Sequence, residues 1–358
     1  MAFVSDLIAA GVIEKDSNND VLWTWAYPAM LSEDKALLIS KCGLGNNDLG
    51  HDLGHGHHTV SFCYCHHHQS WFYLHLTELF ELPILPKVKQ FVLVLQTRDF
   101  NPEKYESLSR ILSKTYCQTG NPADMLQLYL SVLVKGKCSS EDNGTFLVQQ
   151  FDEISVYSSV PAKDVVKTFG LETILIYTAL LLKKRIVVYH HRLDTLLCFV
   201  RALPAFVWHR QNWNIIYPYM QLSSEVSELL TLSTYVAGFR DAAVESRTDL
   251  YDVFVNLAAI EITIAAHAKE IFAMTKTHKD IAVFMTRQAE NTELSDKMFI
   301  KEVSNKTNEL LKNLKTLAVK NEFGQEVIRL SDLKEKKVNL ALENFLWNLA
   351  IAEGYVDV

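Results

Sequence analysis

The chain has 358 residues, of which 49% are hydrophobic and 22% charged, a composition typical of a globular protein and not of a disordered one. At roughly 100–200 residues per domain, this length allows two or three domains. Its 35 basic and 42 acidic residues give a net charge of −7. Because a duplex binder needs a concentrated basic face and no dense lysine and arginine stripe is present, we expect no nucleic-acid partner.

The N-terminal segment does not have the pattern of a signal peptide. It carries Asp6 within its apolar run and no basic residue before that run. Six cysteines are scattered without a framework, so we expect reduced thiols in a cytoplasmic protein. The apolar stretch between Gly170 and Lys183 is about a dozen residues, too short for the roughly 20 that span a bilayer, and no transmembrane segment is predicted.

The first 140 residues alternate predicted strands and helices. They are a hairpin of residues 7–14 and 21–27, a helix over 32–42 and strands near 60–64, 71–76 and 88–96. Two helices then begin at the Asn-Pro pairs 101–102 and 121–122, where asparagine can cap the first turn and proline fits the first helical position. Gly120 and Gly136 stand where these helices should end.

A polar, turn-rich join at residues 137–144 predicts a boundary between two lobes. Beyond it, residues 171–182 are apolar on nearly every side, so this helix is expected to be buried. Residues 186–189 have the β-branched, unalternating composition of a strand covered on both faces. A layered α/β lobe is therefore predicted to about residue 264. Long helical patterns follow over 265–290, 294–317 and 331–354.

The central segment has a recognisable order of elements. An apolar helix ends in Leu180–Arg185, a strand follows at Ile186–Tyr189, and the helix Leu193–Leu203 runs into Pro204–Trp208. This order resembles DENN domains, which act as guanine nucleotide exchange factors for Rab GTPases. Their pattern is an apolar helix with a charged end, a short strand and a helix leading to Pro-x-x-Trp, which here is one residue longer.

The resemblance extends over essentially the whole chain. Tyr235–Phe239, Asp249–Leu257 and Phe91–Gln96 match further strands of the family. Two positions depart from its pattern: Lys184-Arg185 replaces the usual Glu-Arg pair, and Tyr217–Met220 replaces the usual Pro-x-Leu-Pro.

The resemblance implies an α/β fold built as a two-lobe DENN module. Residues 1–140 would form an N-terminal longin-like lobe, an antiparallel sheet with helices. Residues 145–264 would form the α/β core lobe, and residues 265–358 its helical C-terminal portion.

The resemblance also implies a function. DENN modules hold a Rab between their lobes and loosen its GDP, which needs no nucleophile, proton transfer or cofactor. The implied role is a regulator of Rab GTPases in endosomal trafficking, cytoplasmic and peripherally associated with late endosomes. The alternative is a non-catalytic scaffold that keeps the DENN fold and binds coiled-coil subunits of an endosomal recycling assembly, as in Commander. Without an obvious symmetric coiled coil, the chain is expected to be a monomer on its own.

Histidine is concentrated in one segment, with eight of the 13 histidines between residues 51 and 75. A closed zinc site needs four converging ligands, and no CxxC pair or helix-borne HxxxH is present. On a strand, Cys63 and Cys65 would share one face, and His66 and His68 the other. No designed metal site is predicted. A loop that scavenges nickel or zinc and a solvated insertion both remain open, with His55, His57, His58, Cys63 and Cys65 as weak adventitious ligands.

No covalent catalytic site is predicted. The chain has no Gly-x-Ser-x-Gly and no phosphate-binding Gly-x-x-x-x-Gly-Lys-Ser/Thr loop, and His209 has no evident partner. The basic clusters Lys183–Arg185 and Lys334–Lys337 could contact acidic lipid or a GTPase, but such clusters are more often solvated helix ends.

Two aromatic groups are candidates for partner binding or packing. On a strand, Trp23, Trp25 and Tyr27 would share one face. They would either pack under the helices of their lobe or serve as interface anchors, a role that suits large side chains with few rotatable bonds. The partner-facing role is the sharper hypothesis for Trp25 and Tyr27. The second group, Trp208, Trp213 and Tyr217, is expected to be core or packing between lobes.

Overall fold

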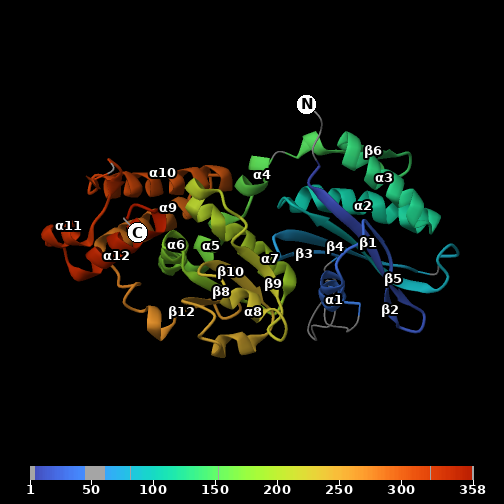
Figure 1. The fold of residues 1–358 in the computed structure, drawn as a ribbon, viewed down its shortest axis with the longest axis horizontal. Coiled ribbons are helices and arrows are strands. Elements are labelled where there is room, and N and C mark those ends of the chain that lie inside the picture. The colour runs from blue at the N-terminus through green and yellow to red at the C-terminus, as the bar shows by residue number, and fades with distance from the viewer. Residues whose placement is uncertain (1–4, 45–60, 81, 152, 323, 357–358) are drawn as a thin grey trace. The chain divides into compact units, whose positions relative to one another are not determined.

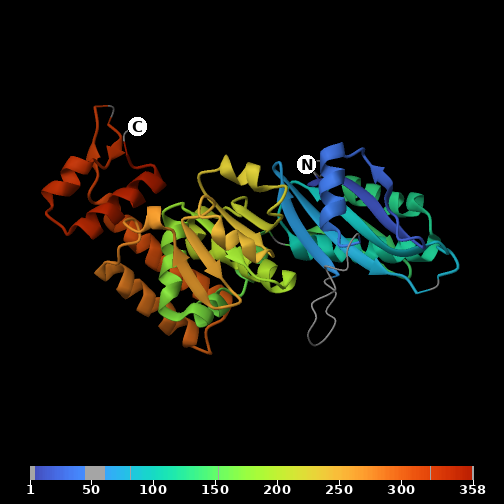
Figure 2. The ribbon, with the colours of Figure 1, turned by 90° about the horizontal axis from the view of Figure 1, so that it is seen from below.

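The computed structural model describes residues 5–44, 61–80, 82–151, 153–322 and 324–356. The chain divides into two compact units, Met1–Val156 and Tyr157–Val358, and each has its own five-stranded sheet (Figures 1 and 2). The predicted two-lobe α/β class is confirmed, with an antiparallel sheet in the N-terminal unit and the helix-rich region at the C-terminal end. The finer division at residues 140–145 and 264 remains a prediction.

The first unit is an antiparallel sheet with helices on both faces. Its strands are β1 (Leu7–Asp16), β2 (Val21–Tyr27), β3 (Phe62–His67), β4 (Ser70–Glu78) and β5 (Val88–Thr97), in the order β2-β1-β5-β4-β3. Its helices are α1 (Ser32–Lys41), α2 (Pro102–Thr119) and α3 (Pro122–Lys135). A hairpin of β6 (Lys137–Ser140) and β7 (Gly144–Leu147) follows, and α4 (Glu153–Ser158) leads into the second unit.

Helices α2 and α3 cover one face of this sheet and α1 lies on the other (Figure 1). Two contacts identify the faces. The hydroxyl of Tyr116 on α2 donates to the carboxylate of Glu14, and Trp23 Nε1 donates to the carbonyl of Lys35 on α1 over 3.1 Å. Trp71, Phe72 and other aromatic side chains fill the core of this unit.

The ends of α2 and α3 were predictable because their chemistry is local. Asn101 accepts from the Lys104 amide over 3.1 Å, and Asn121 accepts from the Ala123 amide over 3.0 Å. Both helices end at a glycine in the left-handed conformation, Gly120 and Gly136.

The second unit is a mainly parallel sheet with helices. Its strands are β8 (Arg185–Tyr189), β9 (Ile216–Met220), β10 (Tyr235–Phe239), β11 (Val253–Asn256) and β12 (Glu261–Ile264), in the order β12-β11-β8-β10-β9, with only β12 antiparallel to its neighbour. Its helices are α5 (Ala162–Phe169), α6 (Thr173–Leu181), α7 (Leu193–Ala202), α8 (Val226–Leu230), α9 (Lys276–Glu290), α10 (Asp296–Lys315), α11 (Leu330–Glu335) and α12 (Leu340–Glu353). A short ribbon of β13 (Val319–Lys320) and β14 (Glu326–Val327) lies between α10 and α11.

The centre of this sheet is buried as predicted. Ile186, Val187 and Val188 of β8 have no exposed surface, and α6 is buried along its length. The neighbouring strands are packed closely, since a Cβ at Gly238 of β10 would lie 2.4 Å from the carbonyl oxygen of Pro218.

The C-terminal helices are shorter than predicted. Residues 265–275 form a short 3-10 helix, Ala266–Ala268, and a loop. Helix α9 begins only after Thr275, which makes a capping box: its hydroxyl accepts from the His278 amide over 3.3 Å, and His278 Nδ1 accepts from the Thr275 amide over 3.1 Å. The segment predicted as 331–354 is two helices, because Asn339 caps a new one by accepting from the Leu342 amide over 2.8 Å.

Candidate partner-binding surface

The predicted common face of Trp23, Trp25 and Tyr27 is wrong. Strand β2 is the outer strand of its sheet, and it contains a β-bulge in which Val12 pairs with Trp25 and Ile13 pairs with Trp23. Residues that pair directly point to the same face, whereas neighbours along a strand point to opposite faces. Trp23 and Trp25 therefore lie on opposite faces of the sheet.

Trp23 belongs to the packing against α1. Its ring is half-buried, Nε1 donates to the Lys35 carbonyl, and the Lys35 ammonium lies 5.7 Å from the ring centre. A Cβ at Gly11 would lie 2.6 Å from Cζ3 of this ring, so glycine makes room for the indole. We therefore assign Trp23 a structural role.

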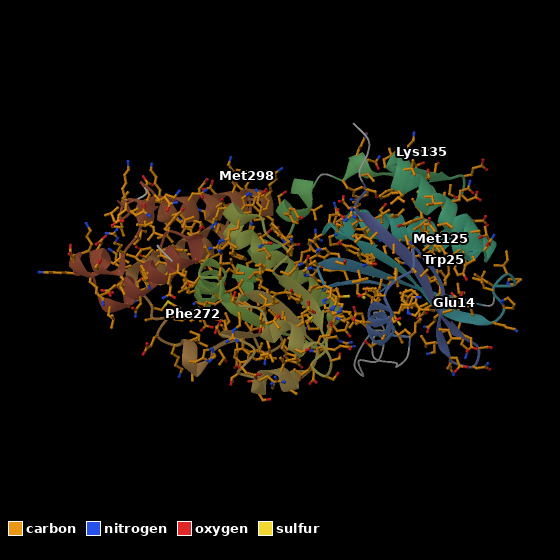
Figure 3. All side chains as sticks on the ribbon, in the orientation of Figure 1. Glu14, Trp25, Met125, Lys135, Phe272 and Met298 are labelled. Atoms are coloured by element: carbon orange, nitrogen blue, oxygen red, sulfur yellow. The ribbon has the colours of Figure 1, made fainter. Side chains whose placement is uncertain are left out.

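Trp25 and Tyr27 lie on the other face, which is the face of Glu14 and the helices α2 and α3. Figure 3 labels Trp25 on β2, Glu14 on β1 and Met125 on α3. Tyr27 is 41% exposed, and its ring meets that of Tyr129 edge-on with centroids 6.4 Å apart. Burial and the neighbouring Tyr27 raise the pKa of Tyr129 to about 12, so the Tyr129 phenol is neutral at physiological pH.

Helix α3 adds a flank that sequence reasoning missed. Met125 and Tyr129 are buried, but Leu126 and Leu130 are only half-buried and Val134 is 68% exposed. Each of these three residues is four positions from the next, so all three lie along one side of the helix. The signal was present in the sequence, because the apolar residues of α3 cover more than the single stripe that a helix packed on one face needs. We call Trp25, Tyr27, Leu126, Leu130 and Val134 the β2–α3 surface.

The histidine-rich segment is described only in part. The candidate ligands His55, His57 and His58 lie outside the described residues. Cys63 and Cys65 are buried in β3, where they pair with Leu74 and Phe72. His66 lies on the opposite face and stacks on Trp71 with ring centroids 4.5 Å apart, so the predicted separation from the thiols is confirmed for His66, whereas His68 lies beyond the end of the strand.

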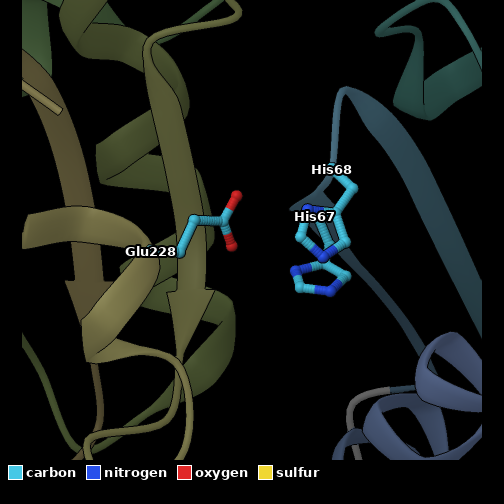
Figure 4. Close-up of side chains that lie close together, drawn as sticks. All are labelled: His67, His68 and Glu228. Atoms are coloured by element: carbon cyan, nitrogen blue, oxygen red, sulfur yellow. The ribbon is translucent and has the colours of Figure 1, made fainter. Parts of the chain in front are cut away.

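Two further histidines, His67 and His68, lie at the turn between β3 and β4, with ring centroids 3.9 Å apart (Figure 4). Glu228, also drawn in Figure 4, belongs to α8 of the second unit. Within either unit taken by itself, the described residues do not bring three histidine, cysteine or carboxylate ligand atoms together. The weak metal candidates thus remain a prediction.

His209, for which no partner was expected, does have one. Its Nε2 lies 3.1 Å from the carboxylate of Glu353, which also pairs with Arg210. Burial alone would raise the pKa of Glu353, but the hydrogen bonds and charges of His209 and Arg210 outweigh it and lower the pKa to about 2. The carboxylate is therefore ionised, and it ties the end of α12 to the segment after α7.

Within the basic cluster Lys183–Arg185, Arg185 is held in an ion pair. Arg185 forms a two-pronged pair with Asp252, with Nη2 3.1 Å from Oδ1 and Nε 3.3 Å from Oδ2. His267 Nε2 lies 2.9 Å from the same carboxylate. Burial would raise the pKa of Asp252, but the hydrogen bonds from Arg185 and His267 outweigh it and hold it below its usual range. Arg185 is thus a structural residue that joins β8 to the start of β11.

The core prediction for the second aromatic group is confirmed for Trp213 and Tyr217, which are buried, whereas Trp208 is half-buried. Trp213 stacks on Tyr157 with centroids 4.0 Å apart, and Trp208 meets it edge-on at 5.8 Å. Trp213 Nε1 donates to the Arg201 carbonyl over 3.1 Å, and Tyr217 is buried in β9.

Comparison with known proteins decides the family. A family model described as "Stabilization of polarity axis" matches residues 160–266. Human DENN domain-containing protein 10 is 44% identical over 355 residues, which are 98% of this chain and 97% of the human protein. The zebrafish (Danio rerio) protein of the same name is 43% identical over the whole of both chains, and that of Dictyostelium discoideum is 35% identical over 96% of each. The chain belongs to the DENN family. The resemblance to the short members of that family is thereby confirmed.

No helix in the described ranges of this DENN protein combines the length and hydropathy that a bilayer crossing demands.

Proposed function

We propose that this chain regulates Rab GTPases in endosomal trafficking by promoting the exchange of GDP for GTP. Family membership over the full length carries the proposal, because the relatives match both units and not one alone. An exchange factor of this family would need both units, since the resemblance implies that a Rab is held by two lobes.

Exchange of this kind is a binding function. A protein that binds the nucleotide-free GTPase more tightly than the GDP-bound form lowers the affinity for GDP by the same factor, because coupling between two ligands is reciprocal. No nucleophile or general base is required.

A scaffold function is the second candidate, and the β2–α3 surface favours it. Tyr27 is 41% exposed and Val134 68%, in a unit whose other large apolar side chains are mostly buried. A partly exposed aromatic residue on an outer strand is suited to anchor a partner. Under this proposal, the surface would bind coiled-coil subunits of a Commander-like assembly at the endosome.

GDP release separates the two functions. We would load a panel of endosomal and secretory Rabs with fluorescent GDP and follow release with and without stoichiometric protein. Selective acceleration of one Rab by about tenfold, equivalent to about 1.4 kcal/mol of the release barrier, supports exchange. Unchanged release from every Rab would contradict it and leave the scaffold function.

The scaffold function has its own test at the β2–α3 surface. Tyr27→Asp and Val134→Asp should each abolish co-purification with the coiled-coil subunits while the protein stays folded. Leu31→Asp is the matched control, because Leu31 is 62% exposed but precedes α1 and lies outside the surface. Equal binding by all three variants would contradict this function.

A further inference from the structure

A pocket of about 180 Å³ lies within the second unit. It is found where α6 ends, beside the first residues of β10. Its walls include Leu180, Val207 and Tyr235, all buried, and Lys183 and Lys184 also line it. The pocket therefore combines an apolar interior with two basic side chains.

The size of the pocket restricts its ligand. Sites for cofactors and drug-sized molecules measure about 300–1,000 Å³, so this pocket is too small for them. An apolar cavity of about 150 Å³ holds a benzene ring. One branched aliphatic or aromatic side chain is the group that fits.

The charge at the pocket selects an acidic ligand. The guanidinium of Arg210, which also lines the pocket, is neutralised by Glu353 and donates to the carbonyls of Leu180 and Leu181 over 2.8 and 2.6 Å. Among the described residues, the ammonium groups of Lys183 and Lys184 have no hydrogen bond or ion pair. Two positive charges are thus available to a carboxylate that approaches.

Lys183 has a conformation that its own residue type disfavours. Its φ is +52°, in the left-handed region, and it follows Leu182, the residue that caps the end of α6. The Lys183 amide donates to Leu180 and the Lys184 amide to Ala179, which is the helix-ending motif in which glycine usually takes the left-handed position. A lysine is favourable to the helix dipole, but Lys184 supplies that effect without a left-handed residue. Backbone strain of this kind clusters at functional sites, so the conformation of Lys183 motivates a search for a binding role.

We propose that this pocket, the α6-end pocket, binds an acidic segment of a partner protein. One apolar side chain of the segment enters the pocket, and carboxylates on either side of it meet Lys183 and Lys184. Binding energy at an interface is concentrated in a few buried anchor residues, and complementary charges around them give specificity. This binding is independent of nucleotide exchange, so its test measures peptide binding and not GDP release.

The test uses two fluorescein-labelled peptides, Glu-Asp-Leu-Asp-Glu and Glu-Asp-Ser-Asp-Glu, with fluorescence anisotropy at low ionic strength. The leucine peptide should bind about tenfold more tightly, because only its anchor buries apolar surface. Its binding should weaken as salt is added, since screening reduces the attraction of exposed charges. In methyl-labelled protein, resonances of Leu180, Val207 and Ile215, which line the pocket, should shift on addition of the leucine peptide.

Two variants and a control locate the effect. Lys183→Gly should weaken the leucine peptide about tenfold without loss of folding, because glycine suits the left-handed position. Lys184→Gln should weaken it to a similar extent. Lys301→Gln removes an equal charge from an exposed position on α10 and should leave binding unchanged.

Three results would overturn the proposal. The first is equal binding of the leucine and serine peptides, and the second is equal binding by Lys183→Gly and Lys301→Gln. The third concerns lipid: binding to phosphatidylserine vesicles that Lys183→Gly abolishes, with no peptide binding, would make the pocket a lipid-headgroup site instead.

Discussion

The outer strand of the first sheet and the central strands of the second are held in different ways. β2 has one neighbour, contains a bulge and leaves Tyr27 41% exposed. β8 and β10 have neighbours on both sides, and the residues of β10 are all buried. A strand with one free side can shift its side chains between faces without disturbing a second ladder. The proposed β2–α3 surface therefore lies where packing constraints are fewest, and the contacts that determine the fold lie where they are greatest.

The largest expected effect tests the central strands. Gly238→Ala should lower the free energy of unfolding by about 3 kcal/mol, because the new Cβ would lie 2.4 Å from the backbone oxygen of Pro218, which cannot rotate away. Urea denaturation followed by circular dichroism measures the loss.

The matched substitution in the first sheet is Gly11→Ala. Its Cβ would lie 2.6 Å from the ring of Trp23, which is half-buried and can move. We expect a loss of about 1 kcal/mol. If the two alanine variants lose equal stability, the outer strand is held as firmly as the centre and the comparison fails.

Local chemistry explains what the sequence could predict. Asn101, Asn121 and the two glycines that follow α2 and α3 act on their own neighbours, so those helices are predictable to the residue. The buried helix α6 and strand β8 are predictable from composition alone. The capping box at Thr275 was missed because histidine takes the place of the usual Glu or Gln.

Long-range geometry explains what the sequence could not predict. The bulge in β2 depends on pairing with β1, and nothing in the residue type of Thr24 signals it. The partner of His209 is 144 residues away, and Lys183 becomes a pocket residue only when α6 and β10 come together. The candidate surface was therefore predictable at Trp25 and Tyr27, but not its limit at Trp23 or its extension onto α3.

The second prediction compares the two units at a buried histidine. Each unit holds one histidine that burial keeps neutral, and protonating it should cost stability. Burial lowers the pKa of His75 and of His278 to about 4. The unfolded chain, with a histidine pKa near 6.5, binds protons first, so stability is complete above pH 6.5 and is lost as the pH falls toward 4. For His278, which is 1% exposed, the loss between pH 6.5 and 5 should be about 2 kcal/mol.

His278→Gln tests this without disturbing the helix, because glutamine at that position also completes a capping box with Thr275. Unfolding free energies measured from pH 7 to 5 should fall less steeply in this variant than in the natural protein. The salt-bridged Glu353 does not interfere, since its pKa of about 2 affects stability only as the pH falls below the ordinary range of a carboxyl. Parallel pH profiles would show that His278 is not the titrating group.

The third prediction separates the two faces of β2. Trp23→Ala should cost about 1.5 kcal/mol, because it removes a half-buried ring and its hydrogen bond to α1. Tyr27→Ala should cost about 0.5 kcal/mol, because much of that ring is already exposed. Thermal unfolding measures both. A Tyr27 variant that loses more stability than the Trp23 variant would make Tyr27 core and remove it from the β2–α3 surface.

The smallest effect concerns two helix ends with the same backbone and different residues. α12 ends at Gly354, whose φ is +73° and around which a Cβ would meet nothing within 4 Å, while α6 is followed by Lys183 at +52°. Lys183→Gly should raise the free energy of unfolding by about 0.5 kcal/mol, since relief of left-handed strain outweighs the greater freedom of glycine in the unfolded chain and the lost dipole interaction. Gly354→Lys should lower it by about 1 kcal/mol for the converse reason. If Lys183→Gly is no more stable than the natural protein, the lysine is not strained and its position at the α6-end pocket needs no functional explanation. A variant that gains stability and loses the acidic peptide would show that a binding role, and not the fold, keeps lysine there.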